Sequence, residues 1–163
     1  MVKERNEGLA PATVALYTHG PVLLAAARAM TVDDADAQDL VQATFEIALR
    51  SLTSLRDPGA MRFWLLRIEA REAMRITRRM RRFVRFDAHV REIPRSDPAI
   101  ADSFALKQAL AALPIRVRAA VALHHLAGLS VRQTAEALGV SENTVKSELK
   151  VGLARLREEL TDD

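Results

Sequence analysis

The chain contains no cysteine and has few aromatic residues. Without cysteine it forms no disulfide and offers no thiolate to a metal, so nothing in it requires an oxidising compartment. Aromatic residues are 4% of its 163 residues, whereas alanine, leucine and arginine are abundant, and this balance favours helices over sheets. We therefore expect an all-α protein.

Long apolar segments are also missing. The first residues, MVKERNEGLAP, have no apolar signal core, and no run approaches the length that crosses a bilayer. We expect a cytoplasmic protein that does not insert into membranes. Its apolar share of 49% is still enough for packed cores, and its net charge is only +3, so the distribution of charge is more informative than the total.

Catalytic motifs are absent from the sequence. There is no Gly-rich phosphate loop, no nucleophile elbow and no pair of carboxylates in an apolar setting, and the acidic residues cluster at predicted helix starts, where the helix dipole favours them. The adjacent His124 and His125 would point about 100° apart on a helix, with no third ligand apparent. We predict no enzymatic activity, no metal and no cofactor.

Residues 129–160 predict two helices joined by a tight turn. Ser130 and Gln133 have the spacing of a capping box, so the first helix should begin at Ser130. Gly139 can adopt the left-handed conformation that ends a helix. Ala135, Gly139 and Val145 then provide the small residue, the turn residue and the core anchor of a helix-turn-helix.

The second of these helices should be long, with Ser141 as its cap and Val145, Leu149, Leu153 and Leu156 as its apolar stripe. Polar side chains that suit phosphates and base edges face outward near its start. They are Glu142, Asn143, Lys146, Ser147 and Lys150. The pattern predicts DNA binding; the alternative is a helical hairpin whose polar face is only solvated.

Two helical segments are predicted upstream. Residues 11–30 form either one kinked helix or two short ones, because Gly20 and Pro21 interrupt the pattern. Residues 36–52 form a helix whose core-facing stripe is Ala37, Leu40, Val41, Thr44, Phe45, Ala48, Leu49 and Leu52. Its outer face is acidic toward the start and consists of Asp36, Asp39, Gln42, Ala43, Glu46 and Arg50. From the residues alone, an ordinary solvated face with capping carboxylates is favoured over a docking surface.

A turn at residues 53–59 leads to a predicted helix at residues 60–82. Five arginines are spaced so that they align along one side of it: Arg67, Arg71, Arg75, Arg78 and Arg82. Only Glu69 and Glu72 lie within the helix to offset this charge. Because such crowding is unfavourable without an anion, we interpret the stripe as a phosphate-binding face. A solvated basic helix is the alternative.

Helical periodicity disappears over residues 86–103, where two prolines occur close together. We interpret this segment as a flexible linker between two small helical domains, residues 9–85 and 104–160. The second domain should open with helices at residues 104–113 and 115–126, separated by Pro114.

Three stretches together resemble the bacterial RNA polymerase sigma factors of the sigma-70 family, in the extracytoplasmic-function (ECF) group. They are DADAQDLVQATFEIAL (residues 34–49), FWLLRI (63–68) and LPIRVRAAVALHHLAGLSVRQTAEALGVSENTVKS (113–147). The resemblance implies a region 2-like domain at 9–85, a region 4-like helix-turn-helix domain at 104–160, and a factor that gives promoter specificity to a polymerase. Its expected partners are core RNA polymerase and promoter DNA, with an anti-sigma protein as a further candidate.

The same resemblance implies roles for particular residues. Docking on the coiled coil of the polymerase beta-prime subunit falls to Asp36, Asp39, Gln42 and Glu46. Contact with the minus 10 element falls to Arg62, Trp64, Arg67, Arg71, Arg75, Arg78 and Arg82. Contact with the minus 35 element falls to Ser141, Asn143, Thr144, Lys146, Ser147 and Lys150, on a domain that also rests on the beta-subunit flap.

The chain departs from the family pattern in both domains. Arg71 stands where the family usually has asparagine and Arg75 where an acid is common, which favours backbone contact over base readout at the minus 10 element. After Ser147 the family continues with basic residues, whereas here Glu148, Val151 and Leu153 follow. A carboxylate near a phosphate is repulsive, so we expect weaker or altered minus 35 binding.

Two other functions fit parts of the sequence. A transcription regulator could use the same helix-turn-helix on an operator without polymerase, and dimerisation on a palindromic site would distinguish it. A protein that mimics a sigma factor and titrates an anti-sigma protein is the other, supported by Glu148 and the missing basic residues.

Overall fold

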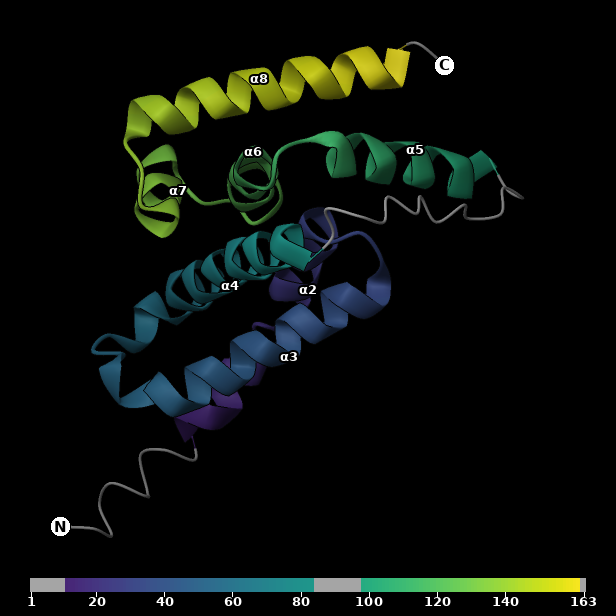
Figure 1. Cartoon of the computed structure of the whole chain (residues 1–163). Coiled ribbons are helices and arrows are strands. Elements are labelled where there is room, and N and C mark those ends of the chain that lie inside the picture. Colours follow the sequence, from purple (N-terminus) through teal and green to yellow (C-terminus); the bar gives the residue numbers. More distant parts are fainter. Residues whose placement is uncertain (1–10, 84–97, 162–163) are drawn as a thin grey trace, which may run out of the picture.

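The computed structural model describes residues 11–83 and 98–161, and every regular element in these ranges is a helix (Figure 1). The all-α prediction is confirmed. None of the helices in the described ranges is long and apolar enough to cross a membrane.

The first half of the described chain begins with two short helices. Residues 11–17 are helical, and after a turn at Thr18 and His19 the helix α2 (Gly20–Met30) follows. Pro21 stands in the first turn of α2, where its missing N–H costs nothing. Of the two alternatives for residues 11–30, the chain therefore adopts the pair of short helices.

Helix α3 (Asp34–Ser51) begins two residues before the predicted start, because Asp33 caps it by accepting a 2.8 Å hydrogen bond from the Asp36 amide. Most of the predicted stripe faces the core, with Ala37, Leu40, Thr44 and Ala48 buried. The prediction is wrong for Leu49, which is 40% exposed. It lies one residue beyond the buried Ala48 and so at the edge of a narrow buried stripe.

A compact turn connects α3 to the next helix through two 3-10 segments, η1 (Leu52–Ser54) and η2 (Pro58–Ala60). The Asp57 carboxylate accepts a 2.9 Å hydrogen bond from the Gly59 amide and so holds the chain as it enters α4 (Met61–Phe83). This helix is one residue displaced from the predicted 60–82. Its buried face is continuous with α2 and α3, which it contacts directly.

The second half comprises α5 (Pro98–Ala112), α6 (Ile115–Val121), the π-helical turn η3 (Ala122–Leu126), α7 (Val131–Leu138) and α8 (Glu142–Thr161). Here one prediction fails: α5 begins at Pro98, whereas residues 98–103 were assigned to the linker. Proline suits the first position of a helix, where no N–H is needed, so it starts this helix instead of preventing it. The rest of the predicted linker, residues 86–97, lies outside the described residues.

Helix α8 packs closely on α6 at Gly152, which is buried. A Cβ placed there would lie 2.9 Å from Val121 Cγ2 and 3.0 Å from Val117 Cγ1. Only glycine therefore allows this approach without displacing the valines. The apolar stripe of α8 accordingly runs through Val145, Leu149, Gly152 and Leu156, with Leu153 at its half-buried edge.

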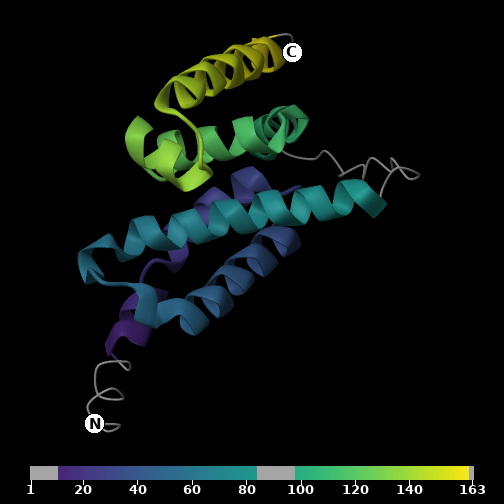
Figure 2. The ribbon, with the colours of Figure 1, turned by 60° about the vertical axis from the view of Figure 1, so that its left-hand side comes forward.

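The two halves are in direct contact. Helix α4 packs against α7 and α6, and α2 packs against η3, α6 and α5. Figure 2 shows α4 between α3 on one side and the second half on the other. The buried residues of both halves belong to one contiguous apolar cluster, so the contact between the halves continues the core of each.

Candidate nucleic-acid and protein interfaces

The helix-turn-helix is built by local hydrogen bonds that the sequence predicts. The Ser130 hydroxyl accepts from the Gln133 amide at 3.0 Å, and the Gln133 side chain accepts from the Ser130 amide at 3.0 Å, so the capping box is complete. Gly139 ends α7 in the left-handed region, with φ 68°. The turn between α7 and α8 is therefore fixed in direction by its own residues.

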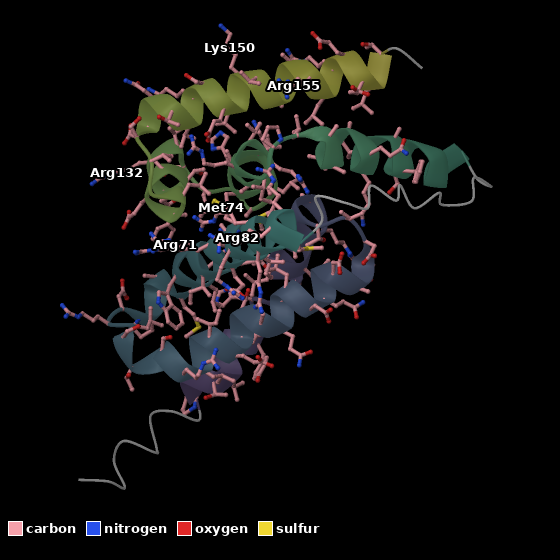
Figure 3. All side chains as sticks on the ribbon, in the orientation of Figure 1. Arg71, Met74, Arg82, Arg132, Lys150 and Arg155 are labelled. Carbon is pink, nitrogen blue, oxygen red and sulfur yellow. The ribbon has the colours of Figure 1, made fainter. Side chains whose placement is uncertain are left out.

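Helix α8 presents its polar side away from the rest of the protein. Asn143, Lys146, Ser147 and Lys150 are exposed, and Figure 3 shows Lys150 projecting from the outer side of the helix. The Ser141 hydroxyl, in contrast, accepts the Thr144 amide at 3.1 Å and contacts the Thr144 hydroxyl at 2.9 Å. These two residues cap the helix, while the other four form the outer face at its start.

Glu148 does not belong to this outer face. Its side chain is 11% exposed and one carboxylate oxygen lies 2.6 Å from the Arg116 Nε of α6. The expectation that Glu148 would repel a phosphate is therefore wrong, because its charge is turned inward and paired within the second half. The departure from the family pattern at this position is a packing contact between α6 and α8.

The basic side of α4 is partly exposed and partly engaged. Arg71, Arg75, Arg78 and Arg82 are exposed on the helix and Arg67 is half-buried. Arg75 forms two hydrogen bonds with Glu72, at 2.6 and 2.9 Å, so its charge is neutralised within α4. Trp64, on the same helix, is half-buried against the core.

Two arginines predicted to contact DNA bond the second half of the chain instead. Arg62 donates through Nη2 to the Ala127 carbonyl, and Arg71 donates through Nε to the Ala137 carbonyl at 3.2 Å. Burial at this contact lowers the pKa of Arg71, with the neighbouring Arg67 charge adding to the effect. Figure 3 shows Arg71 and Met74 on the side of α4 that faces α7.

The acidic side of α3 forms a ridge between two grooves. The first groove, of about 1220 Å³, lies between α3 and α4 and includes Asp36 and Asp39 in its wall. The second, of about 480 Å³, lies against Tyr17 and includes Gln42 and Glu46. Both grooves contain apolar side chains. All four residues predicted to dock on polymerase are exposed and line one groove or the other.

Comparison with known proteins accounts for these surfaces. The model of Sigma-70 region 2 matches residues 16–83 and the model of Sigma-70, region 4 matches residues 103–156. The RNA polymerase sigma-E factor of Streptomyces coelicolor is 33% identical over 145 residues, which are 88% of this chain and 82% of that protein. The chain belongs to the sigma-70 family of RNA polymerase sigma factors.

This sigma factor falls in the ECF group. The ECF RNA polymerase sigma factor SigE of Mycolicibacterium smegmatis is 34% identical over 135 residues, covering 77% of this chain and 52% of that protein. Among solved structures, the sigma factor RpoE in complex with the anti-sigma factor NepR, from Bartonella quintana, superposes with a TM-score of 0.74 at 27% identity, over 99% of both chains.

One carboxylate of this sigma factor was misjudged from the sequence. Glu69, interpreted above as a charge that offsets the arginines, is fully buried in α4, and neither of its oxygens has a hydrogen-bond partner. Burial raises its pKa to about 9, so the side chain is an uncharged acid at neutral pH. It therefore contributes nothing to neutralising the basic side of α4.

Two further side chains, one at the contact between the halves and one within the second half, make bonds that had no signal in the sequence. Arg118 of α6 donates to the Met30 carbonyl at 3.2 Å and to the Leu113 carbonyl at 3.1 Å. His124 Nδ1 lies 2.7 Å from the Leu129 carbonyl oxygen and so takes part in the turn before α7. Both side chains bond to backbone oxygens. Every residue has such an oxygen, so the residue types in the sequence do not reveal these contacts.

Proposed function

We propose that this sigma factor binds core RNA polymerase and directs it to promoters through three surfaces: α3, α4 and α8. The observation that carries this proposal is the helix-turn-helix, in which a complete capping box and the Gly139 turn hold α8 with a polar face directed outward. Its geometry suits insertion of α8 into a major groove. The polymerase supplies the chemistry, so the sigma factor needs no catalytic site.

The start of α8 is proposed to contact the minus 35 element. Asn143 and Ser147 provide hydrogen-bonding groups for base edges, and Lys146 and Lys150 provide charge for phosphates. Ser141 and Thr144 support this face by capping the helix, and their hydroxyls lie at the helix end that would approach the DNA. Because Glu148 pairs with Arg116, it does not oppose this contact.

The basic side of α4 is proposed to hold the minus 10 element. Arg67, Arg78 and Arg82 lie along the helix for contact with the strand, and Arg62 and Arg71 join them once released from their carbonyl partners. Arg75 contributes less, since Glu72 already neutralises it. Trp64 offers an aromatic surface near the turn before α4, where an unstacked base can be held.

The ridge on α3 is proposed to dock on the coiled coil of the polymerase beta-prime subunit. A coiled coil presents apolar residues along its seam with charged residues beside them. The α3 ridge offers the complement, with Asp39, Gln42 and Glu46 exposed between two grooves that have apolar walls. The second half is proposed to rest on the beta-subunit flap. The sigma factor is proposed to act in the cytoplasm, where the polymerase is.

An anti-sigma protein is a further proposed partner. A solved structure similar to this chain is a sigma factor bound to the anti-sigma factor NepR. The same relationship between two chains would keep this sigma factor inactive until a signal releases it. A protein that merely mimics a sigma factor is less favoured, because Glu148, one of its two sequence supports beside the missing basic residues, is paired with Arg116.

The direct test is transcription in vitro with purified core polymerase on a library of promoter sequences. The expected result is sigma-dependent transcripts from promoters that share minus 35 and minus 10 elements. Asp39→Lys should abolish binding to core polymerase while leaving the helical content unchanged, and Glu158→Lys, at the exposed end of α8, is the matched charge reversal that should bind normally. Unchanged core affinity in Asp39→Lys would reject the α3 surface. Specific duplex binding without polymerase would favour an independent regulator.

A further inference from the structure

Three arginines connect the two halves of the chain by bonding to backbone carbonyls across the interface. Arg62 of α4 bonds Ala127, which follows η3, and Arg71 of α4 bonds Ala137 of α7. In the opposite direction, Arg118 of α6 bonds Met30 of α2. We call these three side chains the arginine latch. Each half therefore donates to backbone carbonyls of the other half.

All three acceptors lie at the C-terminal ends of helices. Met30 is the last residue of α2, Ala137 lies in the last turn of α7, and Ala127 caps the end of η3. Carbonyls at these ends lack partners within their own helix and carry the negative end of the helix dipole. The latch therefore depends on the electrostatics of three helix ends, with side-chain complementarity playing a small part.

The latch leaves the charge of its arginines uncompensated. Each acceptor is a neutral carbonyl, and the Arg118 Nε is buried with no hydrogen-bond partner. Burial lowers the pKa of Arg118 and, together with the Arg67 charge, that of Arg71, although Arg71 remains exposed. A phosphate, with a full negative charge, is a stronger partner for a guanidinium than a carbonyl is.

We propose that the arginine latch holds the free sigma factor closed and that a nucleic-acid strand opens it by competing for Arg62 and Arg71. The inference rests on the proposed function for the role of these two residues in DNA binding. In the closed chain each of them already donates to a carbonyl of the second half, so a strand that draws these N–H groups to its phosphates weakens the contact between the halves. Closure and strand binding thus oppose each other.

A variant of Arg118 can test the latch separately from the DNA contacts. It lies on α6 and lines the same groove as Arg75 and Arg82, but it is not one of the proposed DNA contacts, and its bond to Met30 crosses the interface. Arg118→Gln should therefore loosen closure without removing a DNA contact. The matched control is Arg116→Gln, two residues earlier on the same helix, which removes the same charge but breaks only the pair with Glu148 inside the second half.

The distance between the halves reports closure directly. Because the chain has no cysteine, Ala35→Cys on α3 and Ala154→Cys on α8, both exposed positions, can carry two spin labels selectively. The full chain should give one narrow distance distribution at low ionic strength, and so should Arg116→Gln. Arg118→Gln should give a broad distribution extending to longer distances. A short single-stranded DNA oligonucleotide of mixed sequence should broaden the distribution of the parent chain.

Affinity for the same oligonucleotide reports the competition. Because a ligand of the open form binds more weakly in proportion to the closed population, Arg118→Gln should bind the strand about 3- to 30-fold more tightly than the parent. Arg116→Gln should match the parent or bind slightly more weakly. Circular dichroism checks that each variant keeps its helices, and Arg118→Lys, which retains the charge but loses the planar fork, should give an intermediate distance distribution.

Two results would overturn the proposal. If folded Arg118→Gln and Arg118→Lys keep the narrow distribution of the parent, the latch does not hold the halves together. If Arg118→Gln opens the chain but binds the oligonucleotide no more tightly, nucleic acid does not compete for the latch. Failure of the proposed function is seen elsewhere: the chain would then give no sigma-dependent transcripts with core polymerase, while the spin-label distances still respond to Arg118→Gln.

Discussion

Helices α4 and α8 are each proposed to contact promoter DNA, yet they occupy opposite kinds of position in the fold. Helix α4, of 23 residues, is covered by α2 and α3 from its own half and by α6 and α7 from the other. Helix α8, of 20 residues, packs on α5, α6 and α7 and keeps its outer side free of other helices. The difference shows that position in the fold decides which basic residues also bond within the chain, as Arg62 and Arg71 of α4 do.

The largest expected effect concerns the buried side of α4. The pKa of Glu69, about 9 in the folded chain, exceeds its ordinary value of 4.5, so the unfolded chain releases this proton first. Stability is therefore highest below the ordinary pKa and decreases as the pH rises toward 9. Between pH of about 4.5 and about 7 the loss should be about 3 kcal/mol, measured by urea unfolding at a series of pH values.

Glu69→Gln should remove this pH dependence and raise the stability near neutral pH. Glu72→Gln is the control on the same helix: the Arg75 hydrogen bond lowers the pKa of Glu72, so its contribution is present above the ordinary pKa and lost as the pH falls. If Glu69→Gln and the parent show parallel pH profiles, Glu69 does not ionise on unfolding in the way that its burial requires.

The packed side of α8 should be nearly as sensitive. Gly152→Val places methyl groups where Val117 and Val121 already lie, and such overpacking should destabilise the chain by about 2–3 kcal/mol. The free energy of unfolding in urea measures it. Ala154→Val, at an exposed position of the same helix, should change this free energy by less than about 0.5 kcal/mol. Equal effects in the two variants would show that α6 does not restrict α8 at Gly152.

Smaller effects should distinguish the two DNA faces. In the complex with core polymerase, Lys150→Ala should weaken binding to promoter duplex by about 1 kcal/mol and reduce the salt dependence of the affinity by about one counterion, leaving single-strand binding unchanged. Arg78→Ala on α4 should weaken single-strand binding and leave duplex binding unchanged. Fluorescence anisotropy at several salt concentrations measures both, with Arg157→Ala as a basic residue away from either face. Identical losses on both kinds of DNA would mean that the two helices share one binding surface.

Effects of a similar size are expected at the turn that orients α8. Ser130→Ala removes one half of the capping box, and Gly139→Ala forces a side chain into the left-handed region although no neighbour crowds it. Each should cost about 1 kcal/mol of unfolding free energy, without altering the distance between the two halves. Thermal unfolding is the measurement. A cost near zero at Gly139 would indicate that α7 can end in another conformation.

The sequence predicted best what local hydrogen bonds decide. Ser130, Gln133 and Gly139 act within a few residues of themselves, and the turn they predict is present. The interruption of the first helical segment near Gly20 and Pro21 was likewise predicted from local backbone preferences. The start of α5 was missed because proline before a helix and proline within a loop look alike until the neighbouring structure is known.

Contacts between distant segments were beyond such reasoning. Glu69 has the sequence context of a solvated acid, and only the packing of α2 and α3 against α4 makes it buried. Glu148 was assigned to the DNA face because its partner, Arg116, lies 32 residues away in the chain. The bonds from Arg62, Arg71 and Arg118 have backbone acceptors, so no pairing of residue types could reveal them. Which residues contact polymerase and DNA stays a prediction.

A consequence for the divergence of this protein follows from those backbone acceptors. A carbonyl is present whatever the residue type, so substitutions at Met30, Ala127 or Ala137 that preserve the helix ends also preserve the acceptor. Natural variation can therefore weaken or strengthen the attachment between the halves chiefly by gaining or losing arginine. As related sequences diverge, the stability of the closed form would therefore change mainly through mutations at the arginine positions.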